Sequence, residues 1–339
     1  MPEARPASPT GRAADLDLLK TLLVWGMITA HCIQLLAFRP RPPALVISDV
    51  INLITFSGFM FAFGLGVGLS KRDKSWSQRL WPVLLLLLAT WVSELAFTTL
   101  VDKKQLTPDL LVPLFTLSRL YGWSEFLASF TVLYLVIAVA RPLLVRVATN
   151  PIFLGIAVLL CFASTWIVVS QDIPLLATIV GTTNFASFPL LAYLPWFLVG
   201  IAFGRDRLRP NRIDWLLATV ATAAFVYVLW RQGGELPGRF PPTILWVVGP
   251  ALPLLLYLVA SRALAGTGRV PQLLLAPGRH VLASLLLSNL IIFGLRYAVG
   301  YRLGAWWWTP ILAVGIIAAA TLWSAALDLR RKSRAIAAA

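Results

Sequence analysis

The sequence predicts an all-α integral membrane protein, a polytopic bundle of about ten transmembrane helices. Of the 339 residues, 59% are hydrophobic and only 13% are charged. Several apolar runs reach the length of about 20 residues that a helix needs to cross a hydrocarbon core of about 30 Å. These runs are continuous and lack an alternation of period two, which favours helices over a closed barrel.

The expected spans follow one another along the chain between two short tails. Residues 1–14 are expected to form a disordered tail, residues 15–329 the transmembrane domain, and residues 330–339 a basic tail. The first span is full length, so we expect it to be retained and not cleaved as a signal peptide. The segment 109–121 is short and broken by proline, and we place it at the interface or dipping back into the protein. The ten expected spans are 17–38, 47–70, 80–101, 124–146, 151–170, 186–204, 213–230, 242–262, 279–299 and 305–327.

The basic residues of this chain indicate its orientation in a membrane. The formal net charge is +15, but Lys and Arg lie in short clusters between apolar runs, where topology signals are expected. Most of the 29 basic residues fall on one side if the amino terminus is cytoplasmic, and the loop 171–185 on the other side has none. We therefore predict that both termini are cytoplasmic and that nucleic acid is not a partner.

The first span carries three ionisable side chains close to one face. Lys20 and His31 are eleven positions apart, which puts them about 20° out of phase and about 16 Å apart along a helix. Asp17 lies near the same stripe. Ionisable groups aligned in this way predict a face that lines a wet or protein-filled interior and not lipid.

The imidazole of His31, inside the first expected span, has more than one possible role. It can remove a proton from a hydroxyl, carry an acyl group itself, or simply form a structural hydrogen bond. Lys20 can likewise bind an anion or extend its amine to the interface as an ordinary topogenic charge. Both cysteines fall inside expected spans, and the sequence has no metal-ligand cluster, phosphate-binding loop or nucleophile elbow.

The spacing of Lys20 and His31 resembles a motif of the membrane acyltransferase type 3 family, in which Arg or Lys precedes His by a ten-residue gap. Three further segments are similar to parts of that family: Ser57–Gly64, Arg79–Pro82, and Leu194–Gly204 followed by Arg205. Gly26–His31 and Phe59–Ser70 also look like heparan-glucosaminide N-acetyltransferase relatives. The segment 278–284 resembles a late family segment, but Leu287-Ser288-Asn289 stands where an aromatic-plus-His element is usual.

The resemblance implies an acyltransferase in the cytoplasmic membrane of a bacterium. Its donor would be a cytoplasmic acyl-CoA, which we expect to be acetyl-CoA, and its acceptor a hydroxyl of a sugar or of a lipid-linked cell-envelope glycan. His31 would be the base or the acyl carrier, and Lys20, Arg79 and Arg72 would bind the anionic donor. Topogenic charge is the alternative role for each of these three, and a transporter or flippase is the alternative function.

Other polar residues are candidates for substrate contacts. Glu94 sits in the middle of a span, where it can position a substrate hydroxyl or pair with a basic side chain such as Arg119, and we expect both to contact substrate. His280 can be a loop residue, a cap or a donor contact. On the outer side, the candidates for glycan contact are Arg119, Glu125, Arg296 and Arg302, with Tyr121, Trp123, Tyr297, Tyr301 and Trp306 to Trp308 as sugar-stacking surfaces or interfacial anchors.

Overall fold

The computed structural model describes residues 14–38, 40–70, 75–120, 122–167, 169, 174–205, 208–300 and 307–337. Within these ranges the chain is helical and forms no strand. A π-helical turn, Phe97–Val101, extends α3, and a short 3₁₀ helix, Ser164–Trp166, extends α6. The helices are α1 Ala14–Leu36, α2 Pro42–Leu69, α3 Trp76–Ala96, α4 Pro108–Phe115, α5 Glu125–Thr149, α6 Pro151–Ala163, α7 Pro174–Val180, α8 Leu190–Arg205, α9 Arg212–Arg231, α10 Ile244–Val248, α11 Ala251–Gly266, α12 Gln272–Arg279, α13 Val281–Val299 and α14 Trp308–Ala337.

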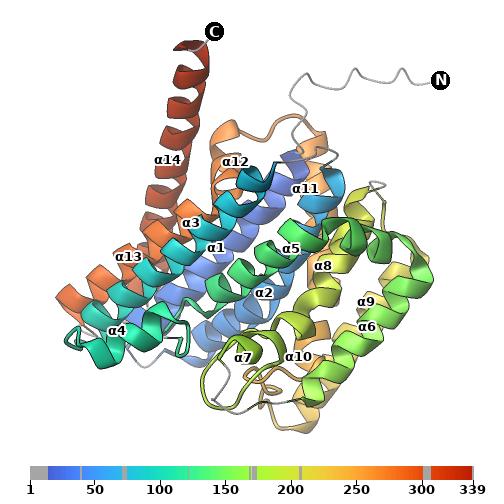
Figure 1. The fold of residues 1–339 in the computed structure, drawn as a ribbon, viewed down its shortest axis with the longest axis horizontal. Helices are drawn as coiled ribbons and strands as arrows, with labels where there is room; N and C mark the ends of the chain where they lie inside the picture. Colours follow the sequence, from blue (N-terminus) through green and yellow to red (C-terminus); the bar gives the residue numbers. More distant parts are fainter. Residues whose placement is uncertain are drawn as a thin grey trace.

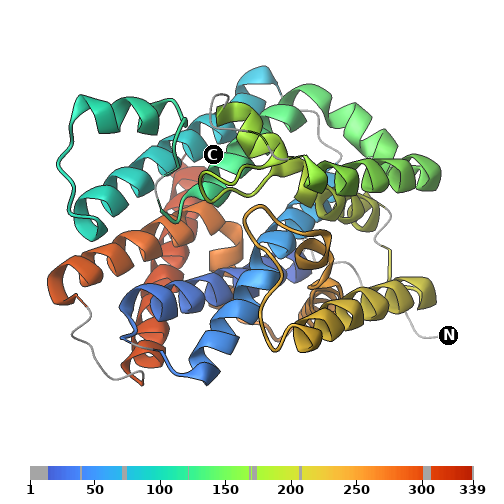
Figure 2. The ribbon, with the colours of Figure 1, turned by 90° about the horizontal axis from the view of Figure 1, so that it is seen from below.

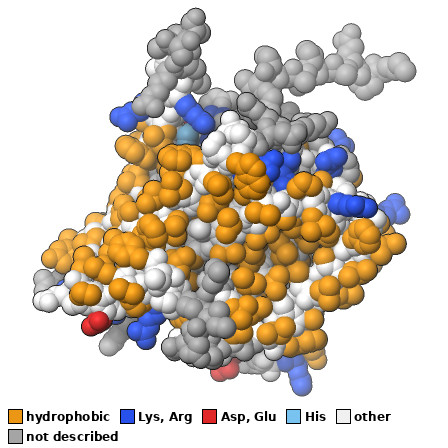
Figure 3. Space-filling model, in the orientation of Figure 1, with side chains coloured by type: hydrophobic (Ala, Val, Ile, Leu, Met, Phe, Trp, Pro, Cys, Tyr) orange, Lys and Arg blue, Asp and Glu red, His pale blue; other side chains and the backbone are white. Residues whose placement is uncertain are grey.

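The length and composition of these helices support the predicted membrane class. Eight helical segments of the described chain are long and apolar enough to cross a bilayer. Two shorter apolar helices, Pro151–Trp166 and Leu190–Arg205, fall on the fifth and sixth expected spans. Figure 3 shows hydrophobic side chains covering the middle of one face, with Lys and Arg gathered along its upper margin. This is the surface expected of a multi-pass helical membrane protein.

Helix α1 is the central element of the fold. It packs against α2, α11, α12, α13 and α14, so the first helix of the chain is surrounded by later ones (Figures 1 and 2). In the Pro-punctuated segment that we placed at the interface or dipping back into the protein, the chain forms α4, a helix of 8 residues that is too short to span.

Four glycines explain why α2 and α8 pack so closely. Gly64 and Gly68 of α2 face Gly200 and Gly204 of α8, and a Cβ atom added at any of the four would collide with backbone atoms of the facing helix. Small residues spaced four apart allow two membrane helices to bring their backbones together. Gly64 and Gly68 therefore allow the backbone of α8 to approach α2 closely.

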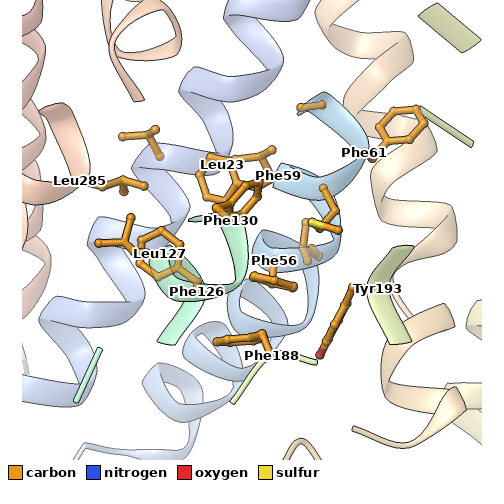
Figure 4. Close-up of a cluster of buried hydrophobic side chains, with 14 of the residues drawn as sticks. Leu23, Phe56, Phe59, Phe61, Phe126, Leu127, Phe130, Phe188, Tyr193 and Leu285 are labelled. Carbon is orange, nitrogen blue, oxygen red and sulfur yellow. The ribbon is translucent and has the colours of Figure 1, made fainter. Parts of the chain in front are cut away.

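An aromatic cluster fills the space between α2, α5 and the segment leading into α8 (Figure 4). The Phe56 ring stacks on Phe188 at a centroid distance of 4.1 Å and meets the edge of Tyr193 at 4.5 Å. Phe130 of α5 packs edge-on against Phe56 at 5.7 Å. This cluster holds α2 against α5 and α8.

Ionic contacts bring the start of α1 and the later half of α14 to the same end of the bundle (Figure 1). Asp17 Oδ2 lies 3.2 Å from Nε of Arg279, and the same guanidinium bonds Asp328 of α14 through Nη1 at 2.8 Å. Arg262 of α11 lies 3.7 Å from Asp15 at this end. Helix α14 continues to Ala337, so residues 330–337 of the predicted basic tail are helical.

Candidate functional site

The centre of the candidate site is a hydrogen bond between α1 and α13. Nδ1 of His31 lies 2.8 Å from Oδ1 of Asn289, and both side chains are buried. Because the amide oxygen accepts, Nδ1 carries the proton and Nε2 keeps its lone pair. No side chain in the described part of the chain bonds Nε2. The geometry therefore holds the neutral tautomer that can accept a proton at Nε2.

Trp123 supports the imidazole from a second direction. Its ring meets His31 edge-on at a centroid distance of 4.6 Å and an interplanar angle of 84°. We predicted an interfacial anchor or a sugar-stacking surface at this position, and the structure places the indole against His31. The next residue, Ser124, donates a hydrogen bond of 3.2 Å to Glu94, so Glu94 holds the segment that carries Trp123.

Glu94 and Arg119 do not form the pair that we considered. The Glu94 side chain is completely buried on α3, whereas Arg119 is exposed beyond α4. Glu94 thus lies close to the His31 site through Ser124, and Arg119 lies apart from it.

Arg239 is a half-buried cation near the site that the sequence reasoning missed. It follows α9 in the loop before α10, and its guanidinium lies over the rings of Phe188 at 5.4 Å and Phe240 at 4.7 Å. Its buried Nε–H finds no hydrogen-bond acceptor among the described residues. Burial lowers the pKa of Arg239, and the nearby carboxylate of Glu125 opposes that shift. The charge of Arg239 also acts on His31.

Lys20 lies in an ionic cluster at the other end of α1. Its Nζ atom is 3.8 Å from Asp17, and the cluster continues through Arg279 and Asp328. Asp328 also accepts a hydrogen bond of 2.8 Å from Nε2 of His280. Two basic and two acidic side chains therefore join α1, α12 and α14, with His280 as a fifth member.

A close backbone contact fixes Lys20 beside α12. Gly278 donates its N–H to Thr21 Oγ1 at 2.9 Å, and its carbonyl accepts from Nζ of Lys20 at 3.4 Å. A Cβ atom at Gly278 would collide with the carbonyl of Asp17. Glycine is required at this position because the two backbones touch.

Arg79 has a structural partner inside the bundle. Pro142 of α5 has no N–H, so the carbonyl of Ala138 lacks its usual helical donor, and Nη1 of Arg79 donates to that carbonyl at 3.2 Å. The Arg79 guanidinium also lies 5.5 Å from the ring of Trp76. Arg72, our third candidate for the donor, lies outside the described residues.

The remaining candidates on the opposite end of the bundle are scattered. The ring of Tyr297 lies 5.8 Å from the amine of Lys103, and Trp307 and Trp308 are exposed and stack on each other at 4.5 Å. Arg296 is half-buried on α13. Four candidates lie outside the described residues: Tyr121, Tyr301, Arg302 and Trp306.

An apolar cavity of about 680 Å³ opens among α1, α2, α3, α5, α12 and α13. Lys20, Arg279 and His280 line one end of it. His31 does not line it, but Leu286 does, one helical turn before Asn289 on α13. One turn is about 5 Å, so the inner end of this cavity approaches the His31 site without reaching it.

Asn289 is also a residue that the sequence reasoning passed over. The segment Leu287-Ser288-Asn289 stood out because it lacks the aromatic-plus-His element of the family that the chain resembles. The signal in the sequence was that Asn289 is a polar residue inside the ninth expected span, where polar side chains often have a functional or structural partner. No family model, curated protein or solved structure matches the chain in the comparisons with known proteins.

Replacing Asn289 by Leu is expected to lower the free energy of unfolding by about 1–3 kcal/mol, because it leaves Nδ1 of His31 buried without its acceptor. The measurement is an unfolding curve of the purified protein in detergent. In a double-mutant cycle, Asn289→Leu should lower the free energy of unfolding by less in the His31→Leu background than in the parent protein. Equal losses from Asn289→Leu in the presence and absence of His31 would contradict the bond.

Proposed function

We propose that the protein is an integral membrane acyltransferase that moves an acyl group from a cytoplasmic acyl-CoA to a hydroxyl of a sugar or of a lipid-linked glycan. The observation that carries the proposal is the His31–Asn289 hydrogen bond, which leaves Nε2 of a buried imidazole as a base. The family resemblance of the Lys20 and His31 spacing supports the same reaction. Acetyl-CoA is the donor that we propose to test first.

The chemistry follows from the free lone pair of Nε2. In one route, Nε2 takes the proton of the acceptor hydroxyl while the oxygen attacks the thioester carbonyl. The carbon–sulfur bond then breaks, and the CoA thiolate leaves and takes the proton from the imidazolium. In the other route, Nε2 attacks the thioester carbonyl, the carbon–sulfur bond breaks and CoA leaves as its thiolate. The acceptor oxygen then attacks the acyl group on Nε2, the bond to Nε2 breaks, and the hydroxyl proton passes to the thiolate. Asn289 serves both routes because it fixes the ring orientation.

The positions of Lys20 and His31 along α1 support a site that the donor and the acceptor reach from opposite ends of the bundle. Lys20 lies at the end where Arg79, Arg262 and Arg279 gather, and we propose that this end is cytoplasmic and receives the donor. Arg239 lies toward the other end, near His31, and we propose that it faces the acceptor. Ten spans with both termini in the cytoplasm, in a bacterial inner membrane, complete the proposed topology.

The test uses purified protein in nanodiscs with acetyl-CoA labelled in the acetyl group and a panel of sugars and lipid-linked glycans. Label in a covalent ester of an acceptor supports the acyltransferase. The same panel in proteoliposomes tests the alternative: movement of unmodified glycan across the bilayer, without esterification, would identify a transporter or flippase and contradict our proposal.

A quenched reaction distinguishes the two chemical routes. Acid-quenched, digested protein that carries labelled acetyl on the peptide containing His31 would favour the acyl carrier. Ester formation without labelled protein at any reaction time would favour the general base.

A further inference from the structure

The cavity beside Lys20 has the depth of one lipid leaflet. On α3 its wall runs from Pro82 to Val92, which is about 15 Å at 1.5 Å per residue. The hydrocarbon core of a bilayer is about 30 Å thick, so this wall corresponds to half of it. A volume of about 680 Å³ is within the range of pockets that hold small molecules.

The rim of the cavity lies on the apolar side of the bundle. Leu88 of α3 lines the cavity and is 43% exposed, and Leu85 and Val92 are also exposed lining residues. The exposed side chains of α3 that do not line the cavity, such as Leu80, Trp81 and Leu84, are also hydrophobic. Figure 3 shows a hydrophobic surface over the middle of the molecule, which we expect to face lipid. A chain can therefore enter sideways from the bilayer without crossing a polar barrier.

The polar end of the cavity is lined by hydrogen-bond donors. Lys20, Arg279 and His280 line it, whereas their carboxylate partners Asp17 and Asp328 do not. Helix α13 begins at the same place with Val281, and its first turn has no side-chain cap. Uncapped N–H groups at a helix start, together with two cationic side chains, favour a negatively charged group.

We infer that this cavity is a binding site for an anionic membrane lipid, with one acyl chain between α3, α5 and α13 and the phosphate beside Lys20 and the start of α13. The apolar wall matches the chain, and the polar end matches the headgroup. This site stands whether or not His31 transfers an acyl group, because His31 does not line the cavity.

The lining favours a lipid over the arm of a CoA molecule. The pantetheine arm contains amides that need hydrogen-bond partners when water is excluded. Between the polar end and Leu286 the wall is almost entirely hydrocarbon, with Tyr134 as its one hydroxyl-bearing side chain. An acyl chain requires no partner there.

The experiment is photo-crosslinking in phosphatidylcholine nanodiscs that contain a small fraction of phosphatidylglycerol with a diazirine in one chain. We expect label on peptides of α3 and α13, and several-fold less label when the same diazirine chain is carried by phosphatidylcholine. Lys20→Gln should lower the phosphatidylglycerol label by about fivefold. Asp17 keeps its ion pair with Arg279 in that variant.

Matched variants separate cavity occupancy from general lipid contact. Leu88→Trp fills the rim and should remove the label, whereas Leu84→Trp, one turn earlier on α3, should retain it. Leu84 is 45% exposed, nearly the same as Leu88, but does not line the cavity. Arg269→Gln, an exposed basic residue at the same end, is the control for Lys20→Gln.

Three results would overturn the inference. The first is equal labelling by the two lipids, and the second is equal labelling of the Leu88→Trp and Leu84→Trp variants. The third is removal of the label by unlabelled CoA as completely as by unlabelled phosphatidylglycerol, which would assign the cavity to the donor. Because the readout is crosslinking and not transfer, an inactive protein can still confirm the lipid site.

Discussion

Replacing His31 by Gln is expected to lower the rate of acyl transfer by about 10²- to 10⁴-fold, the usual contribution of a positioned general base. Glutamine retains a polar side chain that can reach Asn289, but its amide does not take up a proton near neutral pH. The measurement is the initial rate of label transfer from acetyl-CoA to acceptor, with the folded fraction of each variant determined by gel filtration and thermal unfolding.

The other histidine of the chain is the matched control. His280 bonds Asp328 at 2.8 Å in the ionic cluster and lies away from the His31–Asn289 pair. His280→Gln should therefore lose much less transfer than His31→Gln, although His280 lies at the end of the bundle that we propose receives the donor. Normal transfer by the His31→Gln variant, or an equal loss in both variants, would contradict the assignment of His31.

Replacing Gly64 by Ala is expected to lower the free energy of unfolding by about 1–3 kcal/mol, because the added methyl group overpacks a tight interface. A Cβ atom at Gly64 would collide with the carbonyl of Phe197, and a helix backbone cannot rotate away as a side chain can. The measurement is the shift of the unfolding midpoint in detergent.

Gly155 in α6 provides the control for this substitution. Nothing lies within 4 Å of a Cβ atom added there, so Gly155→Ala removes the helix penalty of glycine without a clash. It should be neutral or stabilising by up to about 1 kcal/mol. If Gly64→Ala and Gly155→Ala had the same effect, the close approach of α2 and α8 would be wrong.

The helices could be predicted from the sequence because the apolar runs are long and separated by charged or Pro-rich turns. The two shorter apolar helices were harder to delimit: the fifth expected span ended at 170, and the helical segment ends at Trp166. Hydropathy reports composition, whereas the end of a helix depends on local capping and packing.

The candidate site could be predicted only in part. Lys20 and His31 share one helix, so their spacing is visible in the sequence. Asn289 lies 258 positions after His31, and their contact depends on how α13 packs against α1. Trp123 shows a second limit, because tryptophan near the end of a span is most often an interfacial anchor and its contact with His31 is set by tertiary structure.

Arg239 was missed for a related reason. A single arginine in a loop between two expected spans has the same sequence pattern as any topogenic charge. Its guanidinium lies over the rings of Phe188 and Phe240, and this contact forms only in the folded bundle. No local pattern distinguishes such a residue from an exposed one.

The ionic contact between Asp17 and Arg279 has a consequence for the order of assembly during synthesis. The two residues are 262 positions apart, so the first helix enters the membrane long before its cationic partner has been translated. Asn289, the hydrogen-bond partner of His31, is likewise synthesised 258 residues after His31. The contacts between α1 and the late helices therefore form last. A nascent chain that stops before α12 has a first helix without its contacts to Arg279 and Asn289.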